Sequence, residues 1–596
     1  MKQIIKERLE ALRDVMRREK LDAFIFPSTD PHNGEYVPSH WEGRKWISGF
    51  DGSAGTAVVT MHEAALWTDS RYFISAEEQL SGTEFKLMRE RMPDTPSVSK
   101  WLGLKLVDDR DPYVGIDGNV CSAAMVIELT KELRAEGGIA LHTSLDPFSR
   151  IWKDRPALPT DAVDIHPLQY CGESCASKLT RIRAELKQRH ANGMLVAALD
   201  DIAWTLNLRG SDVHCNPVFV AYLLIDMRST TLFINKEKLS KEVVEYLRGE
   251  GVLVSDYADV KKALRNYQGY NILVDPSEIN YSLYSALPCV KVETVSPIPY
   301  MKAVKNDVEV EGFRNAMIRD GVAMVKFLYW LKTHPDVTTQ SELSVSERLQ
   351  RERGRQEKFK DISFDTIAAY GEHGAIVHYE PTRDSNVKLQ REGLFLLDSG
   401  AQYLDGTTDV TRTIALGALT EEQRRVYTLV LKGHIQLQML KFPYGASGTQ
   451  LDAVARMAMW QEGMNFMHGT GHGVGSYLCV HEGPHQIRME YRPAQLVPGM
   501  IVTDEPGLYL AGRFGVRIEN MLLVKPYMST EFGNFLQFET LTLCPIDKEP
   551  IVVEMLSAEE KKWLDSYHDD VFKRLSRYLT FDERAWLEKA TKPIGY

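Results

Sequence analysis

LFLLDSGAQYLDGTTDVTRT, running from Leu394 to Thr413, decides the fold of the last third of this 596-residue chain. Four apolar residues lead into Asp398, and a threonine-rich run carries Asp409 after an Asp-Gly pair. Such runs around Asp-Gly predict a β-hairpin. A hairpin centred between Tyr403 and Leu404 places Asp398 directly opposite Asp409 on one face. Carboxylates this close repel each other unless protons or cations neutralise them, although acids near a turn are also common without a metal.

Three histidines follow downstream, embedded in glycine-rich sequence. His468 and His472 lie in HGTGHGVG, and His481 lies in VHEGP, so that all three fall within fourteen residues. Glycine lets the backbone and a ligand approach each other closely. A lone histidine is usually satisfied in the core or at the surface, whereas a cluster among glycines favours a binding site.

Two glutamates complete the pattern. Glu505 lies in IVTDEPG and Glu519 in GVRIEN, and both stretches are predominantly apolar. An unpaired charge on a buried strand costs several kcal/mol, so each glutamate needs a partner. Four carboxylates and one imidazole suit a hard, oxygen-rich centre for two cations better than a structural zinc site. The sequence therefore predicts five metal ligands: Asp398, Asp409, His472, Glu505 and Glu519.

The order of these motifs resembles that of the pita-bread metallopeptidases, which include methionine aminopeptidase, prolidase and aminopeptidase P. Three longer strings are similar to the three-domain, cytosolic-type Xaa-Pro aminopeptidases: GFDGSAGTAVVT at 49–60, LDSGAQYLDGTTDVTRT at 397–413 and HGTGHGVGSYLCVHEGP at 468–484. The likeness covers nearly the whole chain, since NLRGSDVHCNPVF at 207–219 and WLDSYH at 563–568 also belong to it.

The resemblance implies how the five ligands share two divalent ions, with manganese the family's usual metal. Asp409 and Glu519 would bridge both ions. Asp398 would complete the coordination of one ion, and His472 and Glu505 that of the other.

The resemblance also implies the substrate and the groups that act on it. The expected substrates are peptides with an N-terminal Xaa-Pro sequence, attacked at the first peptide carbonyl by a hydroxide shared between the metals. Glu505 would act as general acid and base, and His468 and His481 would stabilise the oxyanion or hold the peptide. For Arg71, a substrate-binding role and the role of an ordinary cation at a strand end fit the sequence equally well. The expected substrate-binding side chains are Arg71, His378, His468, His481 and Arg517.

Strands alternating with helices predict two related α/β domains ahead of the catalytic domain. We place them at 1–165 and 166–299, and the pita-bread catalytic domain, of α+β character, at 300–596. The proline pair in the segment 295–299 marks the second boundary, because proline continues neither a helix nor a strand ladder. The repetition of the plan predicts a duplicated fold.

Two helices are expected to open the catalytic domain. Asn306 or Asp307 can cap a long helix that runs toward the His-Pro pair at 334–335. A second helix begins near Thr339, where Thr-Gln-Ser-Glu fits a capping box.

The bulk composition narrows the partners and the compartment. A formal net charge of -11 argues against nucleic acid. Seven scattered cysteines do not form a disulfide framework, which favours a reducing, cytoplasmic setting. No apolar run approaches the roughly 18 residues of a membrane helix, and the first residues lack a signal-peptide pattern. By analogy with relatives, we expect a homodimer.

Three alternatives remain at this stage. Prolidase acts on dipeptides, and its chains usually carry one N-terminal domain rather than two. Creatinase-type enzymes on this fold lack the full acidic ligand set. A non-catalytic binding module for histones, RNA or proteins would have lost metal ligands, whereas all five are present here.

Overall fold

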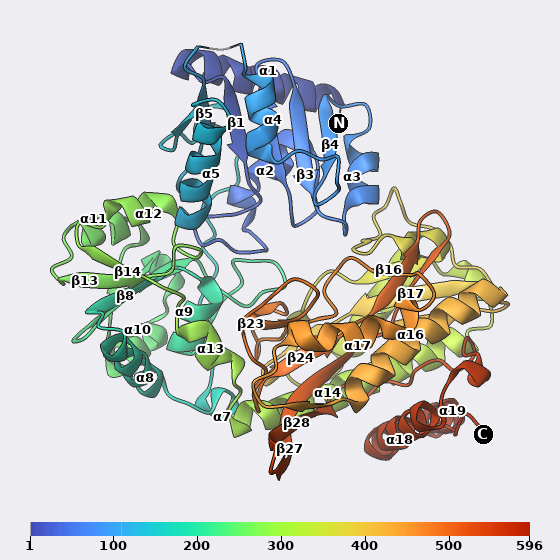
Figure 1. Ribbon diagram of the computed structural model, residues 1–596. Coiled ribbons are helices and arrows are strands. Elements are labelled where there is room, and N and C mark those ends of the chain that lie inside the picture. Colours follow the sequence, from blue (N-terminus) through green and yellow to red (C-terminus); the bar gives the residue numbers. More distant parts are fainter. Residues whose placement is uncertain (1, 109, 596) are drawn as a thin grey trace. The chain divides into compact units, whose positions relative to one another are not determined.

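The computed structural model describes residues 2–108 and 110–595, and the chain divides into two compact units (Figure 1). The N-terminal unit comprises Met1–His166 and Glu173–Ile298, and the C-terminal unit comprises Pro167–Gly172 and Pro299–Tyr596. No helix among the described residues combines the length and apolarity needed to cross a membrane.

The N-terminal unit holds two six-stranded sheets with the same plan. The first has the order β4-β3-β2-β1-β5-β6, and the second has the order β12-β11-β10-β8-β13-β14. In each sheet a central strand pairs antiparallel on one side and parallel on the other, as β1 does with β2 and β5 and β8 does with β10 and β13. This repetition confirms the predicted pair of related α/β folds.

The strands of the first sheet are β1 (Ala23–Phe26), β2 (Thr56–Thr60), β3 (Ala64–Thr68), β4 (Phe85–Arg89), β5 (Tyr113–Ile116) and β6 (Ala140–His142). The strands of the second are β8 (Gly193–Val196), β10 (Ala221–Asp226), β11 (Thr230–Ile234), β12 (Val252–Ser255), β13 (Asn271–Val274) and β14 (Val290–Glu293), and the short strands β7 (Asp164–Ile165) and β9 (Leu208–Arg209) pair separately. Apolar strands buried on both faces explain this layout, since every residue of β1 is buried.

Helices cover these sheets by their apolar faces. In α1, Leu9, Leu12 and Met16 lie on the predicted buried face and are fully buried. The helices of this part of the chain are α1 (Lys2–Glu19), α2 (Gly43–Ser48), α3 (Phe73–Leu80), α4 (Val98–Lys105), α5 (Ala123–Ala135), α6 (Phe148–Ile151), α7 (Leu168–Cys171), α8 (Cys175–Gln188), α9 (Leu199–Leu206), α10 (Lys241–Gly249), α11 (Val260–Arg265), α12 (Tyr281–Ala286) and α13 (Ile298–Ala303).

The C-terminal unit packs helices against several small sheets, and Figure 1 shows α16 and α17 lying across its strands. Its main sheets have the orders β21-β28-β27-β24-β22-β23, β16-β17-β20 and β15-β18-β19, and β25 pairs with β26. Its helices are α14 (Asp307–Thr333), α15 (Glu342–Gly354), α16 (Glu421–Met439), α17 (Gly448–Trp460), α18 (Ala558–Leu575) and α19 (Phe581–Ala590).

The strands of this unit are short and closely spaced along the chain. They are β15 (Phe359–Ile362), β16 (Ile367–Tyr370), β17 (Leu394–Ser399), β18 (Ala401–Tyr403), β19 (Gly406–Thr407), β20 (Val410–Ala415), β21 (Lys441–Pro443), β22 (Gly471–Gly473), β23 (Glu482–Ile487), β24 (Ile501–Asp504), β25 (Gly507–Leu510), β26 (Phe514–Arg517), β27 (Asn520–Thr530) and β28 (Gly533–Thr540).

Local capping sets where the first two helices of this unit begin. Asn306 caps α14, with Glu309 completing a capping box, as the sequence predicts. The predicted start of α15 is wrong by two residues: Ser341 is the cap, with Ser344 as its reciprocal partner. Thr339 is instead the last residue of a short 3₁₀ turn that Asp336 caps.

The hairpin exists, but its predicted register is wrong. Asp398 lies opposite Thr411, and Tyr403 lies opposite Gly406, so the hairpin centre is one position further along the chain. Asp405 fastens this turn through an ion pair with Lys358 at 2.7 Å. The pairing therefore shifts by two residues. Side chains alternate between faces with a period of two, so the shift keeps both aspartates on one face as diagonal neighbours.

A buried ion pair holds the end of β17, the strand that carries Asp398. Arg353 donates through Nε and Nη2 to the two carboxylate oxygens of Asp320 at 2.8 and 3.0 Å. The same guanidinium donates to the backbone carbonyls of Ser399 and Gly400, each at 3.3 Å. Both side chains of the pair are almost fully buried.

We expect Asp320→Ala to destabilise the C-terminal unit by about 3–5 kcal/mol, because it leaves the Arg353 charge buried without its carboxylate. Urea unfolding monitored by tryptophan fluorescence measures the change. Asp569→Ala is the control, since it removes the exposed pair with Lys573 on α18 and should leave the midpoint unchanged. Equal midpoints for both variants would contradict the assigned role of the buried pair.

Candidate metal centre

The five predicted ligands converge in the C-terminal unit. Asp409, His472 and Glu519 offer ligand atoms that all lie within 4.8 Å of one another. His472 Nε2 lies 3.4 Å from an oxygen of Asp409 and 3.6 Å from an oxygen of Glu505. Asp409 lies close enough to Asp398 for its negative charge to raise the pKa of the Asp398 carboxyl. Residues more than 120 positions apart in sequence thus meet in one place.

Backbone hydrogen bonds fix the segments that carry these side chains. The N–H of Glu505, directly after β24, donates to the Thr470 carbonyl at 2.8 Å. The N–H of Glu519, between β26 and β27, donates to the Thr411 carbonyl at 3.1 Å. The sequence suggested that both glutamates lie within strands. In the structure, each instead follows the end of a strand. A strand end fixes the backbone while leaving the side chain free to reach inward.

Burial dominates the electrostatics of the acids. It raises the pKa of Asp398 and Glu519, and it raises that of Glu505 to about 7. The negative charge of Asp409 adds to this effect on all three. Burial lowers the pKa of His472, but Asp409 and Glu505 outweigh it and raise that pKa to about 9. When ionised, the four carboxylates together carry more negative charge than the positively charged side chains beside them neutralise.

The donor set fits divalent cations. Asp398 Oδ1 is buried and has no hydrogen-bond partner among the described residues. The other oxygen, Oδ2, accepts from Arg517 Nε at 3.1 Å and Nη2 at 2.7 Å. Glu519 keeps one oxygen against the Thr411 hydroxyl at 2.8 Å. A buried carboxylate oxygen without a donor is costly unless a cation binds it, so these residues suit hard metal ions.

Arg517 and His468 are joined through a tyrosine that the sequence reasoning missed. Tyr509 accepts a hydrogen bond from Arg517 Nη1 at 2.7 Å, and its hydroxyl lies 2.8 Å from His468 Nε2. Burial raises the pKa of Tyr509 to about 12, so the phenol keeps its proton. Tyr509 lies on β25, whose first residue pairs with Arg517 on β26. The sequence shows only that the two residues are near each other in the chain.

The remaining predicted residues lie in different surroundings. The His481 ring meets the His472 ring edge-on, with centroids 4.4 Å apart. His378 lies half-buried in the segment between β16 and β17. Arg71 belongs to the N-terminal unit, where it donates to both oxygens of Asp69 at 2.8 and 2.7 Å. The structure therefore joins His481 directly to the ligand cluster, and the substrate roles of Arg71 and His378 stay predictions.

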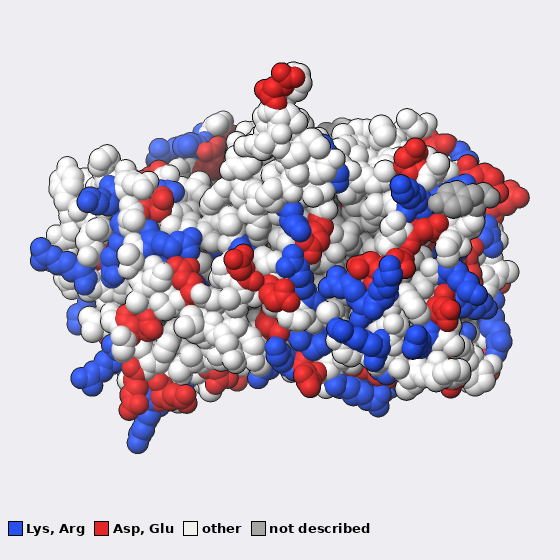
Figure 2. All heavy atoms as spheres, turned by 90° about the horizontal axis from the view of Figure 1, so that it is seen from below, with Lys and Arg blue, Asp and Glu red and all other residues white. Residues whose placement is uncertain are grey.

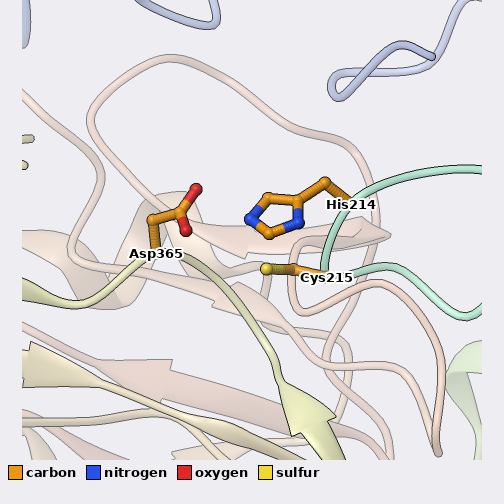
Figure 3. Close-up of side chains that lie close together, drawn as sticks. All are labelled: His214, Cys215 and Asp365. Carbon is orange, nitrogen blue, oxygen red and sulfur yellow. The ribbon is translucent and has the colours of Figure 1, made fainter. Parts of the chain in front are cut away.

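Figure 3 shows three further side chains with metal-binding chemistry. His214 and Cys215 are adjacent in the loop between β9 and β10 of the N-terminal unit, and Asp365 lies in the loop between β15 and β16 of the C-terminal unit. Because they come from different units, we do not count them with the five ligands.

Comparison with known proteins defines the class of the chain. The profile of metallopeptidase family M24 matches residues 311–526, and that of its C-terminal region matches 534–594. Profiles of the creatinase/prolidase N-terminal domain match 8–146 and 154–309. The chain belongs to metallopeptidase family M24, and it is a hydrolase.

Full-length relatives then place it within that family. A probable Xaa-Pro aminopeptidase P of Paracoccidioides brasiliensis is 40% identical over 613 residues, and aminopeptidase P1 of Arabidopsis thaliana is 38% identical over 646, each alignment covering 99% of both chains. The crystal structure of X-prolyl aminopeptidase from Caenorhabditis elegans, described as a cytosolic enzyme with a di-nuclear active site, matches with a TM-score of 0.94 and 36% identity over 99% of both chains. The chain is thus a member of the Xaa-Pro aminopeptidase branch.

Gly471 sits where a side chain would displace a predicted ligand. A Cβ at this position would lie 1.9 Å from the Thr503 carbonyl oxygen, which belongs to the neighbouring strand β24. We expect Gly471→Ala to push β22 away and move His472, lowering manganese affinity about 10-fold or more. Equilibrium dialysis with metal analysis measures the affinity.

Gly469→Ala is the matched control two positions away. Its Cβ would meet the nearest atoms at ordinary contact distances of 3.5 and 3.6 Å, so its manganese affinity should stay within twofold of the wild type. Wild-type affinity in Gly471→Ala would contradict the close approach as the reason for glycine there.

Proposed function

We propose that this chain is a two-metal aminopeptidase that releases the N-terminal residue from peptides with proline in the second position. The observation that carries the proposal is the convergence of four carboxylates and one imidazole in the C-terminal unit. The full-length similarity to proteins named Xaa-Pro aminopeptidase supports the substrate class.

The metal ligands in this proposal are the five predicted residues. Asp398, Asp409, His472, Glu505 and Glu519 would together hold two divalent ions, with Asp409 and Glu519 shared between them, Asp398 on one ion, and His472 and Glu505 on the other. Manganese is the proposed metal on the family resemblance, and the donor set of mostly oxygens agrees with it. When bound, such a pair of ions would lower the pKa of a bound water and so supply a nucleophile for the first peptide carbonyl near neutral pH.

Glu505 is the proposed proton carrier. A glutamate carboxylate in this place can take up a proton and return it, which is the role that the family resemblance gives to Glu505. Its oxygen lies 3.6 Å from His472 Nε2, which keeps it within the ligand cluster. We assign to it the transfer of a proton to the leaving nitrogen of proline.

His481 and His468 take different parts in this proposal. His468 Nδ1 lies 2.7 Å from the Gly469 carbonyl, so Nδ1 carries the proton and Nε2 accepts from the Tyr509 hydroxyl. Both ring nitrogens of His468 are thus engaged within the protein. We therefore assign donation to the tetrahedral oxyanion to His481, and we assign to His468 the orientation of Tyr509 and Arg517 beside the peptide.

The similarity to Xaa-Pro aminopeptidases supplies the proline specificity in this proposal, and the chemistry of the bond explains why a dedicated enzyme is needed. The bond before proline is a tertiary amide without an N–H, and its chain direction is restricted. The free N-terminal amine of the substrate would pair with the carboxylates, which restricts cleavage to the first bond. Arg71, His378 and Arg517 are the proposed contacts that hold the rest of the peptide.

The wider setting follows by analogy and by charge. We propose a homodimer and a cytoplasmic location, without nucleic-acid or membrane partners. None of the seven cysteines forms a disulfide, and acidic and basic side chains are interspersed on the face in Figure 2. We also propose three domains, at 1–165, 166–299 and 300–596, with one six-stranded sheet in each of the first two.

Metal-stripped protein tests the activity. We expect no hydrolysis of Arg-Pro-Pro by stripped protein and full recovery with manganese, with arginine released about 100-fold faster than glycine is released from Gly-Pro. Product release measured by mass spectrometry gives both rates. Glu505→Gln should fold normally and lose about 10²–10⁴-fold in kcat.

Prolidase and the non-catalytic module each give a different outcome. A preference for Gly-Pro over Arg-Pro-Pro would make the chain a prolidase. Folded protein that binds no divalent ion, and that manganese does not activate, would favour a non-catalytic binding module. Retained activity in Glu505→Gln would refute its role as the proton carrier.

A further inference from the structure

A second cluster of buried charges lies beside the five predicted ligands. It was not predicted from the sequence, and the proposed reaction gives it no role. Lys305 forms an ion pair with Glu482, and Lys302 Nζ lies 3.9 Å from the other oxygen of the same carboxylate. The three side chains are at most 3% exposed. Lys305 Nζ also donates to the Lys302 carbonyl at 2.9 Å, which joins the two lysines.

Glu482 is joined to the proposed catalytic groups on two sides. It directly follows His481 in the chain, at the point where the loop after β22 enters β23. Its backbone pairs with Gly473, the neighbour of His472 on β22. His481 itself lies in the loop, outside the strand ladder, so the residue after it is the first that the sheet holds.

The lysines provide a fixed support for this carboxylate. The N–H of Lys305 donates to the Gly499 carbonyl at 3.0 Å, and Val304 forms a bridge with Met500. Met500 lies next to β24, the strand that ends just before Glu505. The lysine backbone is therefore fastened to the same sheet and cannot follow Glu482 if that side chain moves.

An ion pair of this kind fixes geometry more than it adds stability. Burying charges is costly, and apolar residues of similar volume often stabilise a fold as well or better. Charged groups, however, prescribe a distance and a direction that apolar contacts do not. Two lysines converging on one carboxylate from a fixed backbone segment restrict where Glu482 lies, and with it the residue that precedes it.

We propose that Lys302, Lys305 and Glu482 form an ionic anchor that positions His481 against His472. The anchor rests on the proposed function, because it acts through His481, the assigned oxyanion donor. None of the three is among the proposed substrate contacts, so they are positioning residues. The anchor also makes the segment that opens the C-terminal unit part of the machinery that orients the reacting groups.

A double-mutant cycle between Glu482 and His481 tests the anchor. We expect Glu482→Gln to lower kcat for Arg-Pro-Pro about 10-fold, with KM nearly unchanged, in manganese-loaded protein well below its melting temperature. In the His481→Ala background the same substitution should change kcat less than twofold, because the residue that it positions is gone. Equal losses in both backgrounds would overturn the anchor, since independent effects multiply.

Asp212→Asn is the matched control for a general loss of stability. Asp212 and Lys238 form another fully buried lysine–carboxylate pair, in the N-terminal unit. This variant should melt earlier yet keep the wild-type kcat. If Glu482→Gln does not fold, the paired replacement of Lys305→Met and Glu482→Met removes both charges and should fold with the same low kcat. A wild-type kcat in that folded variant would overturn the anchor.

A crystal structure of Glu482→Gln tests the anchor without relying on activity. We expect the His481 ring to leave its edge-on contact with His472, and an unchanged ring would overturn the proposal. Failure of the proposed function looks different, because then wild-type protein loaded with manganese would not cleave Arg-Pro-Pro at all.

Discussion

Four carboxylates that converge in one small volume, three of them buried and Glu505 partly exposed, cannot all remain charged unless cations join them. Asp398, Asp409, Glu505 and Glu519 form such a group, and their own protein partners fall short of neutralising it, since one buried oxygen of Asp398 has no donor among the described residues. This repulsion is the constraint on which the C-terminal unit depends. A pair of divalent ions resolves it, and the same ions supply the chemistry of the family.

The fold meets this constraint by holding backbones and leaving side chains to converge. Short strands end at or beside each acid, and hydrogen bonds between distant segments, such as Glu519 to Thr411 and Glu505 to Thr470, fix the ends. Buried ion pairs fasten the surroundings, with Arg353 at the end of β17 and Glu482 next to His481. Rigid supports around a repelling centre keep the ligands in place before a metal arrives.

Local patterns carried most of the sequence predictions. An apolar run, a threonine-rich run and the Asp-Gly pair between them identified the hairpin, and the start of α14 lies at Asn306, one of the two predicted caps. The predicted register failed by two residues, because the hairpin sequence alone does not fix where the turn is centred. The prediction that Asp398 and Asp409 share one face still holds, because a shift by an even number of residues leaves each side chain on the same face. Glu482 escaped notice because its lysine partners are distant in sequence, and Tyr509 because no sequence pattern places its hydroxyl between His468 and Arg517. The five candidate ligands could be picked out because acids beside apolar stretches and a histidine among glycines are unusual, and the structure brings these side chains together.

X-ray diffraction from manganese-loaded crystals tests the two-metal centre most directly. Anomalous difference maps recorded near the manganese edge should contain two peaks, both within coordination distance of Asp409 and Glu519. Asp398 should contact one of these peaks only, with His472 and Glu505 at the other. A single peak, or peaks away from these side chains, would contradict the account.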